Sequence, residues 1–149
     1  RDQVWWAICS KDNNKMIGYV SLTDIHYINR SANFSGIVIG DKDYQDGLAW
    51  IETYLFVYEY AFERLGMNRV YGTYMIGHKT TSFIGPVLFS QREGVLRQAY
   101  YKNGRFYDAA IGGILSEDYF AHKAKGDYEL DAVLKRMKEK IRENRKRHE

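Results

Sequence analysis

Residues 34–70 constrain the fold of this chain more than any other segment. They predict a short strand, a polar turn, a long helix and a second strand, in that order. The β-branched run Ile37–Ile39 is followed by Gly40, which is typical of a strand covered on both faces. A strand, helix, strand order usually gives two parallel strands joined by a crossover, with the helix N-terminus beside the end of the first strand.

The predicted helix runs from about Leu48 to Leu65, because apolar residues recur there at helical spacing. Gly66 stands where a C-terminal cap belongs, and Asn68–Met75 alternates as a strand. The segment Asp43–Gly47 before the helix is polar and turn-forming. Free backbone N–H groups and the helix dipole stabilise a pyrophosphate at such a helix N-terminus. The sequence therefore predicts an anion-binding turn.

This unit resembles the cofactor-binding unit of the GNAT superfamily of acyl-CoA-dependent N-acetyltransferases. Its branch of ribosomal-protein, polyamine and nucleotide-amino-sugar acetyltransferases is the most similar. Residues 4–10 and 16–23 match the hairpin that precedes the cofactor strand, and Asn103-Gly104 predicts a second hairpin. The resemblance covers about residues 3–120 and is also carried by the stretch 93–119. It implies an α/β (α+β) fold with a mixed, mostly antiparallel sheet, to which this chain adds a C-terminal helix.

The resemblance implies acetyl-CoA as co-substrate. The family's turn carries Gln or Arg, two free positions, Gly, a free position, and Gly or Ala. Gln45 takes the first position, and two alignments remain open: one puts Leu48 and Trp50 on the small positions, and the other puts Gly47 and Ala49 there. We favour the second, because small residues let the backbone approach the phosphates. The predicted cofactor-binding residues are Ile37, Val38, Ile39, Gln45, Asp46, Gly47, Leu48, Ala49, Trp50, His78 and Thr81.

Three functional positions of the family are altered. The Asn that bonds pantetheine falls on His78, in a stretch expected to be a polar loop, and the Tyr that protonates the CoA thiolate falls near Gly85. His78 is expected to contact pantetheine or to carry the proton, or else to be a solvated side chain. The family's Glu base falls near Asn33, which cannot accept a proton, so Asp24 and His26 are the nearest substitutes. Asp24 also fits a turn at a strand end. The predicted catalytic residues are His78 and Asp24.

The implied reaction is direct transfer of an acetyl group to a primary amine. The amine belongs to a small molecule, with a nucleotide-linked amino sugar as one candidate, or to a protein N-terminus. Backbone N–H near Val38 or Ile39 is expected to bind the thioester carbonyl. The alternative is a degenerate GNAT domain that binds CoA or a partner without catalysis.

Composition limits the other classes of function. The 149 residues, 45% of them hydrophobic, suit one GNAT-like domain at residues 1–123 and a charged amphipathic helix at residues 124–149. The family's elements before the first hairpin are missing, so we expect either a piece of a longer protein or an open acceptor side. Cys9 is the single cysteine and the four histidines share no ligand spacing, so neither a disulfide nor a metal is expected. No apolar run reaches membrane-spanning length, and the cytoplasm is the expected setting.

The net charge of +3 comes from the tail. Residues 124–149 hold nine Lys or Arg and six Asp or Glu, and the other residues carry thirteen of each. An apolar stripe in the tail predicts a helix that packs on the domain or on a second subunit, so a homodimer is one expected arrangement. We expect no nucleic-acid partner and no membrane partner. The stripe consists of Leu130, Val133, Leu134, Met137 and Ile141.

Overall fold

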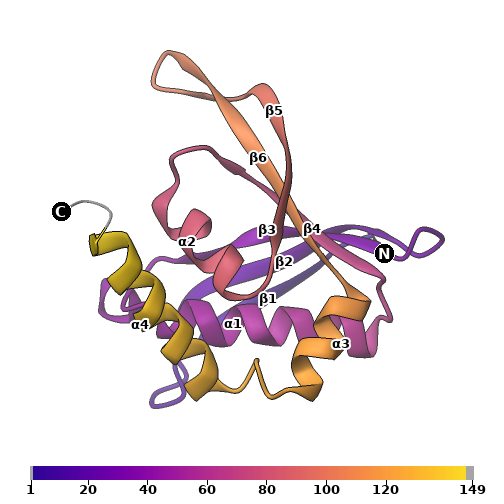
Figure 1. Ribbon diagram of the computed structural model, residues 1–149, viewed down its shortest axis with the longest axis vertical. Helices are drawn as coiled ribbons and strands as arrows, with labels where there is room; N and C mark the ends of the chain where they lie inside the picture. The colour runs from indigo at the N-terminus through magenta and orange to yellow at the C-terminus, as the bar shows by residue number, and fades with distance from the viewer. Residues whose placement is uncertain (1, 147–149) are drawn as a thin grey trace. The chain divides into compact units, whose positions relative to one another are not determined.

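Residues 2–146 are described in a computed structural model, in which the chain forms two compact units, residues 1–73 and 74–149. The elements that begin in the first unit are β1 (Val4–Cys9), β2 (Met16–His26), β3 (Ser31–Ile39), the 3₁₀-helix η1 (Lys42–Tyr44), α1 (Leu48–Glu59), the π-helical turn η2 (Tyr60–Arg64) and β4 (Arg69–Met75), whose last two residues lie in the second unit (Figure 1).

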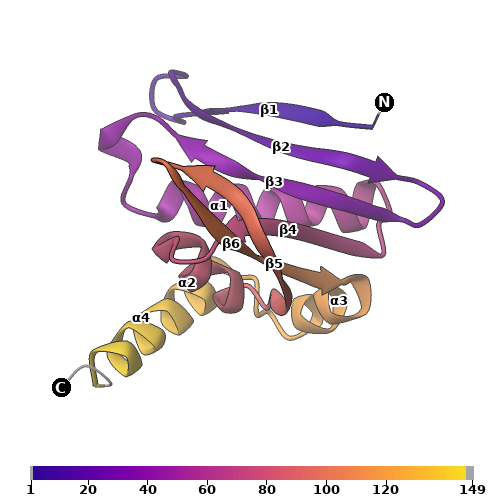
Figure 2. The ribbon, with the colours of Figure 1, turned by 90° about the horizontal axis from the view of Figure 1, so that it is seen from above.

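The strands of the first unit form one mixed sheet. β1 pairs antiparallel with β2, and β2 pairs antiparallel with β3. β3 pairs parallel with β4, from Ser31 opposite Arg69 to Asn33 opposite Tyr71. Figure 2 shows β1, β2 and β3 side by side. The expected first hairpin and the strand, helix, strand unit are both confirmed.

α1 packs against one face of this sheet through apolar and aromatic side chains. Ile51 and Tyr58 are almost fully buried, with 1% and 2% of their surface exposed. Phe34 of β3 meets Tyr54 with ring centroids 4.4 Å apart, and Trp6 of β1 meets Phe56 at 5.4 Å. These contacts fix the direction of the helix and therefore the place of its N-terminus.

The helix ends close to its predicted boundary. After α1 the backbone widens into η2, and Gly66 follows with φ +64°, the left-handed conformation expected of a C-terminal glycine. Arg30 Nε donates a 2.7 Å hydrogen bond to the Gly66 carbonyl. This side chain therefore fastens the helix end to the turn between β2 and β3.

β3 differs from its prediction in length and in burial. It begins at Ser31, so Asn33, which was expected to lie just before the strand, is part of it. Ile37 and Ile39 are buried, but Val38 is 45% exposed. The expectation of a strand covered on both faces was therefore wrong within this run: side chains alternate across a strand, and α1 covers only the face of Ile37 and Ile39.

The second unit contains α2 (Lys79–Val87), β5 (Gln91–Lys102), β6 (Arg105–Leu115), α3 (Ser116–Ala124) and α4 (Leu130–Lys146). β5 and β6 form a long antiparallel hairpin (Figure 1). Its turn, Asn103-Gly104, has φ of +52° and +77°, which confirms the hairpin predicted from this pair. Between Leu96 and Tyr100 the register shifts, and Gln98 N donates a 2.8 Å hydrogen bond to Asp108 Oδ1 there.

α4 is fastened to α2 within the second unit. The Phe89 ring stacks on His122 at 3.5 Å, and the Arg136 guanidinium lies 4.6 Å from the centre of the same ring. Arg136 Nε also donates a 3.1 Å hydrogen bond to the Val87 carbonyl. Val133 of the predicted stripe is fully buried, whereas Ile141 is 42% exposed. The domain boundary after residue 123 stays a prediction, and residues 147–149 of the predicted tail lie outside the described residues.

Gly18 is predicted to be essential for the pairing of β2 with β3. A Cβ on Gly18 would lie 2.1 Å from the Val38 carbonyl oxygen, whereas a Cβ on Gly40 would have its nearest neighbour, the Ile17 carbonyl oxygen, at 4.0 Å. We expect Gly18→Ala to lower the free energy of unfolding by about 1–3 kcal/mol or more and Gly40→Ala to change it little, as measured by urea unfolding. Equal stability of the two variants would contradict the close approach of the strands.

Val133 is predicted to stabilise the second unit more than Ile141 does. Val133 is fully buried and Ile141 is 42% exposed, although both lie on the same stripe. We expect Val133→Ala to cost about 2 kcal/mol and Ile141→Ala less than about 0.5 kcal/mol in urea unfolding. Similar costs for the two changes would mean that the far half of α4 packs as tightly as the near half.

Candidate functional site

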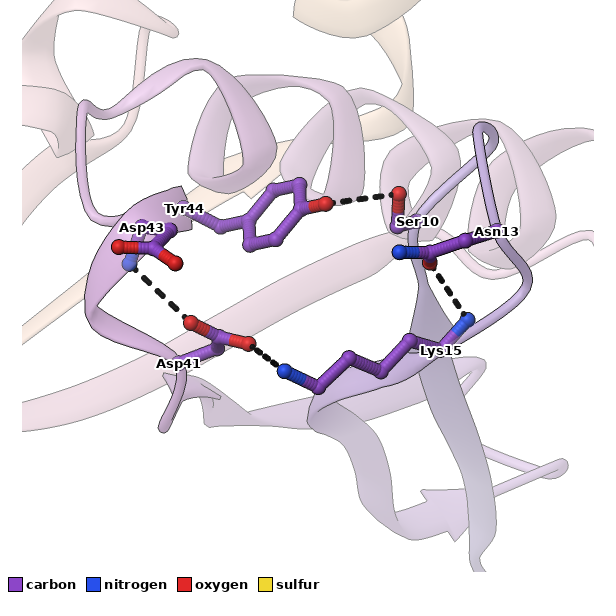
Figure 3. Close-up of polar contacts among 6 residues, drawn as sticks. All are labelled: Ser10, Asn13, Lys15, Asp41, Asp43 and Tyr44. Carbon is purple, nitrogen blue, oxygen red and sulfur yellow. Dashed lines mark hydrogen bonds and ion pairs between the residues drawn. The ribbon is translucent and has the colours of Figure 1, made fainter.

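The candidate cofactor turn, residues 40–47, joins β3 to α1 and is held mainly by polar contacts. η1 within it has no buried residue. Asp41 caps η1 by accepting a 3.1 Å hydrogen bond from Asp43 N, and Lys15 Nζ bonds the other carboxylate oxygen of Asp41 at 2.7 Å (Figure 3). Tyr44 Oη donates a 3.0 Å hydrogen bond to Ser10 Oγ. Residues of the β1–β2 turn therefore locate this part of the chain.

The start of α1 offers two open backbone donors. Gly47 precedes the helix with φ +95°, a conformation that favours glycine. Leu48 N donates to Asp46 Oδ1 at 2.9 Å, and Ile51 N donates to the Gly47 carbonyl at 3.1 Å. In the part of the chain that the structure describes, the N–H groups of Ala49 and Trp50 make no such bond. An anion at this helix end would meet these two donors together with the helix dipole.

The same helix end already holds a carboxylate. Asp46 accepts from Leu48 N, where a ligand oxygen would otherwise bind. Asp41 and Asp43 add two more carboxylates to the turn, and the cations beside the three carboxylates are Lys42 of the turn and Lys15, which pairs with Asp41. A bound pyrophosphate would therefore meet repulsion from these carboxylates as well as attraction from the N–H groups.

Gln45 has a different partner from the one expected. Its Nε2 donates a 2.9 Å hydrogen bond to the carbonyl of Ile39, the last residue of β3. The side chain therefore fastens the turn to the strand. Its second amide hydrogen is still available to a ligand, so the predicted cofactor contact stays a prediction.

β3 changes direction before it reaches the turn. Its parallel pairs with β4 run only from Ser31 to Asn33 in the described residues. The pairing with β2 then shifts by one residue at Ser35, and Gly36 has φ +116°. A bulge of this kind bends a strand and increases its twist. The second half of β3 therefore does not continue the parallel pairing with β4 that its first half makes.

The β2 register selects which N–H groups of β3 can bind a ligand. Gly40 N donates to the Ile17 carbonyl at 2.9 Å, so the antiparallel alternation directs Val38 N–H toward β2 as well. The N–H groups of Ile37 and Ile39 point away from β2. Of the two groups expected near the thioester, only that of Ile39 is directed away from the neighbouring strand.

Asp24 lies beside Asn33, the position that the resemblance assigned to the family's base. Asn33 Nδ2 donates a 3.1 Å hydrogen bond to Asp24 Oδ2. Asp24 has φ +48° at an irregularity of the β2–β3 pairing, and its side chain is exposed. The irregular pairing near Asp24 therefore directs its carboxylate toward the side chain of Asn33.

His78 and Thr81 lie in the second unit and are joined there. The expected polar loop around them was wrong, because residues 79–87 form α2. His78 is the N-cap: its Nδ1 accepts from Thr81 N at 3.4 Å and lies 3.0 Å from Thr81 Oγ1. Capping by His78 and burial of Ile84 and Val87 outweigh the weak helix propensity of this polar sequence. The predicted pantetheine contact of His78 stays a prediction.

Other kinds of site find little support in the described residues. Within residues 2–146, no cluster of three or more His, Cys, Asp and Glu side chains is placed to bind a metal ion. The helices of this part are too short or too polar to span a bilayer. The candidate site thus rests on backbone donors and a few carboxylates.

The chain has the fold of the GNAT N-acetyltransferases, which confirms the expected fold class, although no family model matches its sequence. A crystal structure of the spermidine/spermine N-acetyltransferase SpeG from Vibrio cholerae superposes with a TM-score of 0.75 at 23% identity, over 82% of this chain and 70% of that one. A dodecameric structure of spermidine N-acetyltransferase from the same organism gives 0.74 at 24% identity, over 80% and 68%. These likenesses establish the fold alone.

One curated relative is similar in sequence. The chain is 28% identical over 110 residues to the uncharacterized N-acetyltransferase YoaA of Bacillus subtilis, which covers 74% of this chain. The match spans 61% of the length of YoaA. The assignment to the ribosomal-protein and amino-sugar branch stays a prediction.

The cap role of His78 predicts a difference between two substitutions. Asn is a good N-cap, so His78→Asn is expected to keep the free energy of unfolding, whereas His78→Ala is expected to lower it by about 1 kcal/mol. Urea unfolding measures both. Equal stability of the wild type and both variants would show that the His78–Thr81 contact does not stabilise α2.

Proposed function

We propose that the chain is an N-acetyltransferase that moves an acetyl group from acetyl-CoA to a primary amine. The observation that carries the proposal is the pair of open N–H groups of Ala49 and Trp50 at the start of α1, in a chain with the GNAT fold. A pyrophosphate is the anionic part of CoA that fits such a helix end. The similarity to YoaA supports the same reaction class.

The acetyl group would lie along the second half of β3. Ile39 N–H points away from β2 and is available to bind the thioester carbonyl oxygen. Negative charge develops on that oxygen in the transition state, and a fixed backbone dipole stabilises it without reorganising. The amine nitrogen attacks the carbonyl carbon, the C–N bond forms, and the C–S bond breaks to release the CoA thiolate.

Asp24 is the proposed base. Its carboxylate is exposed and is held by Asn33 at 3.1 Å. Because Asn33 precedes Ile39 by six residues on β3, the proton from the attacking amine would reach Asp24 through a chain of water molecules. The released thiolate takes up one proton from solvent and Asp24 returns its proton to solvent, so that in net one proton moves from the amine to the CoA thiol. Asn33 orients the carboxylate and does not itself accept a proton.

The proposed acceptor is a small primary amine, with a protein N-terminus as the alternative. The names of the SpeG structures give spermidine and spermine as what those enzymes acetylate, and one of them is dodecameric. A polyamine and a nucleotide-linked amino sugar are therefore the first acceptors to test here, and a homodimer is the smallest assembly to look for. The proposed setting is the cytoplasm.

A specific observation favours a second function, a degenerate GNAT domain that no longer catalyses. Asp46 occupies the helix end where pyrophosphate would bind, and Asp41 and Asp43 lie in the same turn. A turn of this charge binds CoA more weakly than a neutral one would. Such a domain would keep the fold and bind CoA or a partner without acetyl transfer.

Two measurements test the proposed function. Acetyl-CoA and CoA are expected to raise the melting temperature of the protein, because a ligand that binds only the folded state stabilises it. Release of CoA thiol is then expected with spermidine, with a nucleotide-linked amino sugar or with a peptide that has a free N-terminus. Stabilisation without thiol release for any amine would support a degenerate domain that binds CoA. No stabilisation would contradict the proposed enzyme and leave only a degenerate domain that binds a partner.

Removal of the Asp46 charge is predicted to tighten CoA binding. Asp46→Asn keeps an N-cap side chain but removes one unit charge from the helix end, and at about 4 Å in water that charge is worth about 1 kcal/mol, or about fivefold in affinity. Calorimetry with CoA measures the effect. Asp12→Asn, in the exposed β1–β2 turn, is the control and is expected to have little effect. Unchanged or weaker binding by Asp46→Asn would place the pyrophosphate elsewhere.

A further inference from the structure

The turn between β1 and β2 and the start of β2 lie against the candidate cofactor turn and hold it in place. Lys15 Nζ bonds Asp41 Oδ2 at 2.7 Å, and Tyr44 Oη donates to Ser10 Oγ at 3.0 Å (Figure 3). Gly40 N donates to the Ile17 carbonyl at 2.9 Å. These contacts join the cofactor turn to residues 10–17.

These contacts are the main positional constraint on η1. η1 contains no buried residue, so apolar packing does little to fix it. Asp41 uses one carboxylate oxygen to cap Asp43 N at 3.1 Å and the other to bind Lys15. The carboxylate therefore links the local shape of the turn to its place on the sheet. The Asp41 side chain is only 15% exposed, so the carboxylate of this ion pair is partly shielded from water.

Lys15 extends from a turn that is itself well ordered by hydrogen bonds. Ser10 N donates to the Lys15 carbonyl at 2.9 Å, and Lys15 N donates to Asn13 Oδ1 at 3.0 Å (Figure 3). Asn14 N donates to the Ser10 carbonyl at 3.0 Å. The base of the lysine side chain is thus fixed, which lowers the entropy lost when its ammonium group binds Asp41.

We infer that Lys15 is a positioning residue of the proposed CoA site, acting through Asp41 on the turn that precedes α1. This inference rests on the proposed function. Lys15 fixes the turn and also balances one of its three carboxylates, Asp41, Asp43 and Asp46. Loss of Lys15 would loosen the turn and leave its charge more negative, and both changes weaken the binding of a pyrophosphate at the start of α1.

The pair should be intact across the neutral range. The hydrogen bond to Lys15 holds the pKa of Asp41 below 3.8, and the hydrogen bond to Asp41 holds the pKa of Lys15 above 10.5. The contribution of Asp41 is therefore lost only as the pH falls through its lowered pKa, and that of Lys15 only as the pH rises through its raised pKa. Asp43 and Tyr44 also face Lys15 and favour its charged form. The effect of Lys15 on CoA binding should be constant between about pH 6 and pH 9.

The test compares Lys15→Met with a matched control from the same turn. Lys11 Nζ pairs with Glu52 of α1 at 3.1 Å, with 86% and 45% of the two side chains exposed, and it does not contact the cofactor turn. We expect Lys15→Met to weaken CoA binding by about threefold to tenfold in calorimetry, and Lys11→Met to weaken it less than about twofold. Lys15→Arg keeps the charge and the donor, and is expected to restore most of the affinity.

Kinetics and exchange separate positioning from a general loss of structure. In acetyl transfer, Lys15→Met is expected to raise the KM for acetyl-CoA and to leave the KM for the amine unchanged. Amide hydrogen exchange in residues 42–47 is expected to speed up in Lys15→Met but not in Lys11→Met. Asp41→Asn also breaks the ion pair but makes the turn less negative, so it should speed up exchange in the same residues, and the double variant should speed it up no further.

The outcomes distinguish this inference from the proposed function. A wild type that is folded but binds no CoA overturns both. A wild type that binds CoA, with Lys15→Met equal to it in affinity and exchange, overturns the role of Lys15 and leaves the proposed function intact. Equal losses in Lys15→Met and Lys11→Met would mean that any cation of the β1–β2 turn attracts CoA, which also overturns positioning by Lys15.

Discussion

Burial of α1 against β3 is the constraint on which the first unit depends. Ile37 and Ile39 point from the sheet toward α1, and Ile51 and Tyr58 point from α1 toward the sheet. Because this packing sets the helix direction, the short turn between β3 and α1 must bring the helix N-terminus to the end of the strand. Every feature of the candidate site in this unit, from the bulge at Gly36 to the open donors of α1, depends on that arrangement.

The site combines two opposing electrostatic influences within a few residues. The helix dipole and the N–H groups of Ala49 and Trp50 attract an anion, whereas Asp46 opposes one. A carboxylate at a helix N-terminus stabilises the helix when no ligand is present. Asp46 thus stabilises the start of α1 and at the same time lowers the affinity of this helix end for an anion. The affinity that remains decides whether the chain works as an enzyme or keeps only the fold.

The sequence predicted the regular parts of the molecule better than its exceptions. Hydrophobic periodicity located α1, and the Asn103-Gly104 pair located the β5–β6 hairpin, because both signals arise from neighbouring residues. The helix α2 was missed, since a capping histidine and buried contacts override the weak propensity of its polar residues. The exposure of Val38 was also missed, because a run of three β-branched residues does not reveal that only one face is covered.

The candidate site shows the same limit. Gln45 and Gly47 could be found from their place before the helix, but the bond from Gln45 to the Ile39 carbonyl depends on how the turn closes. Asp24 approaches Asn33 because the β2–β3 register is irregular there, and no pattern in the sequence indicates that irregularity. The contact of Lys15 with Asp41 joins residues far apart in the chain, and only the fold brings them together.

The Phe89 ring has a consequence for how the second unit opens. Phe89 has φ +66°, a conformation that is costly for an aromatic residue and persists only when its surroundings impose it. His122 stacks on the ring and Arg136 lies over it, so the end of α2, the end of α3 and the first half of α4 are fastened at one point. Beyond Lys140 the residues of α4 are exposed, so the helix should fray from its C-terminal end while its first turns open only together with Phe89. One strained residue thus divides a continuous helix into two cooperative segments.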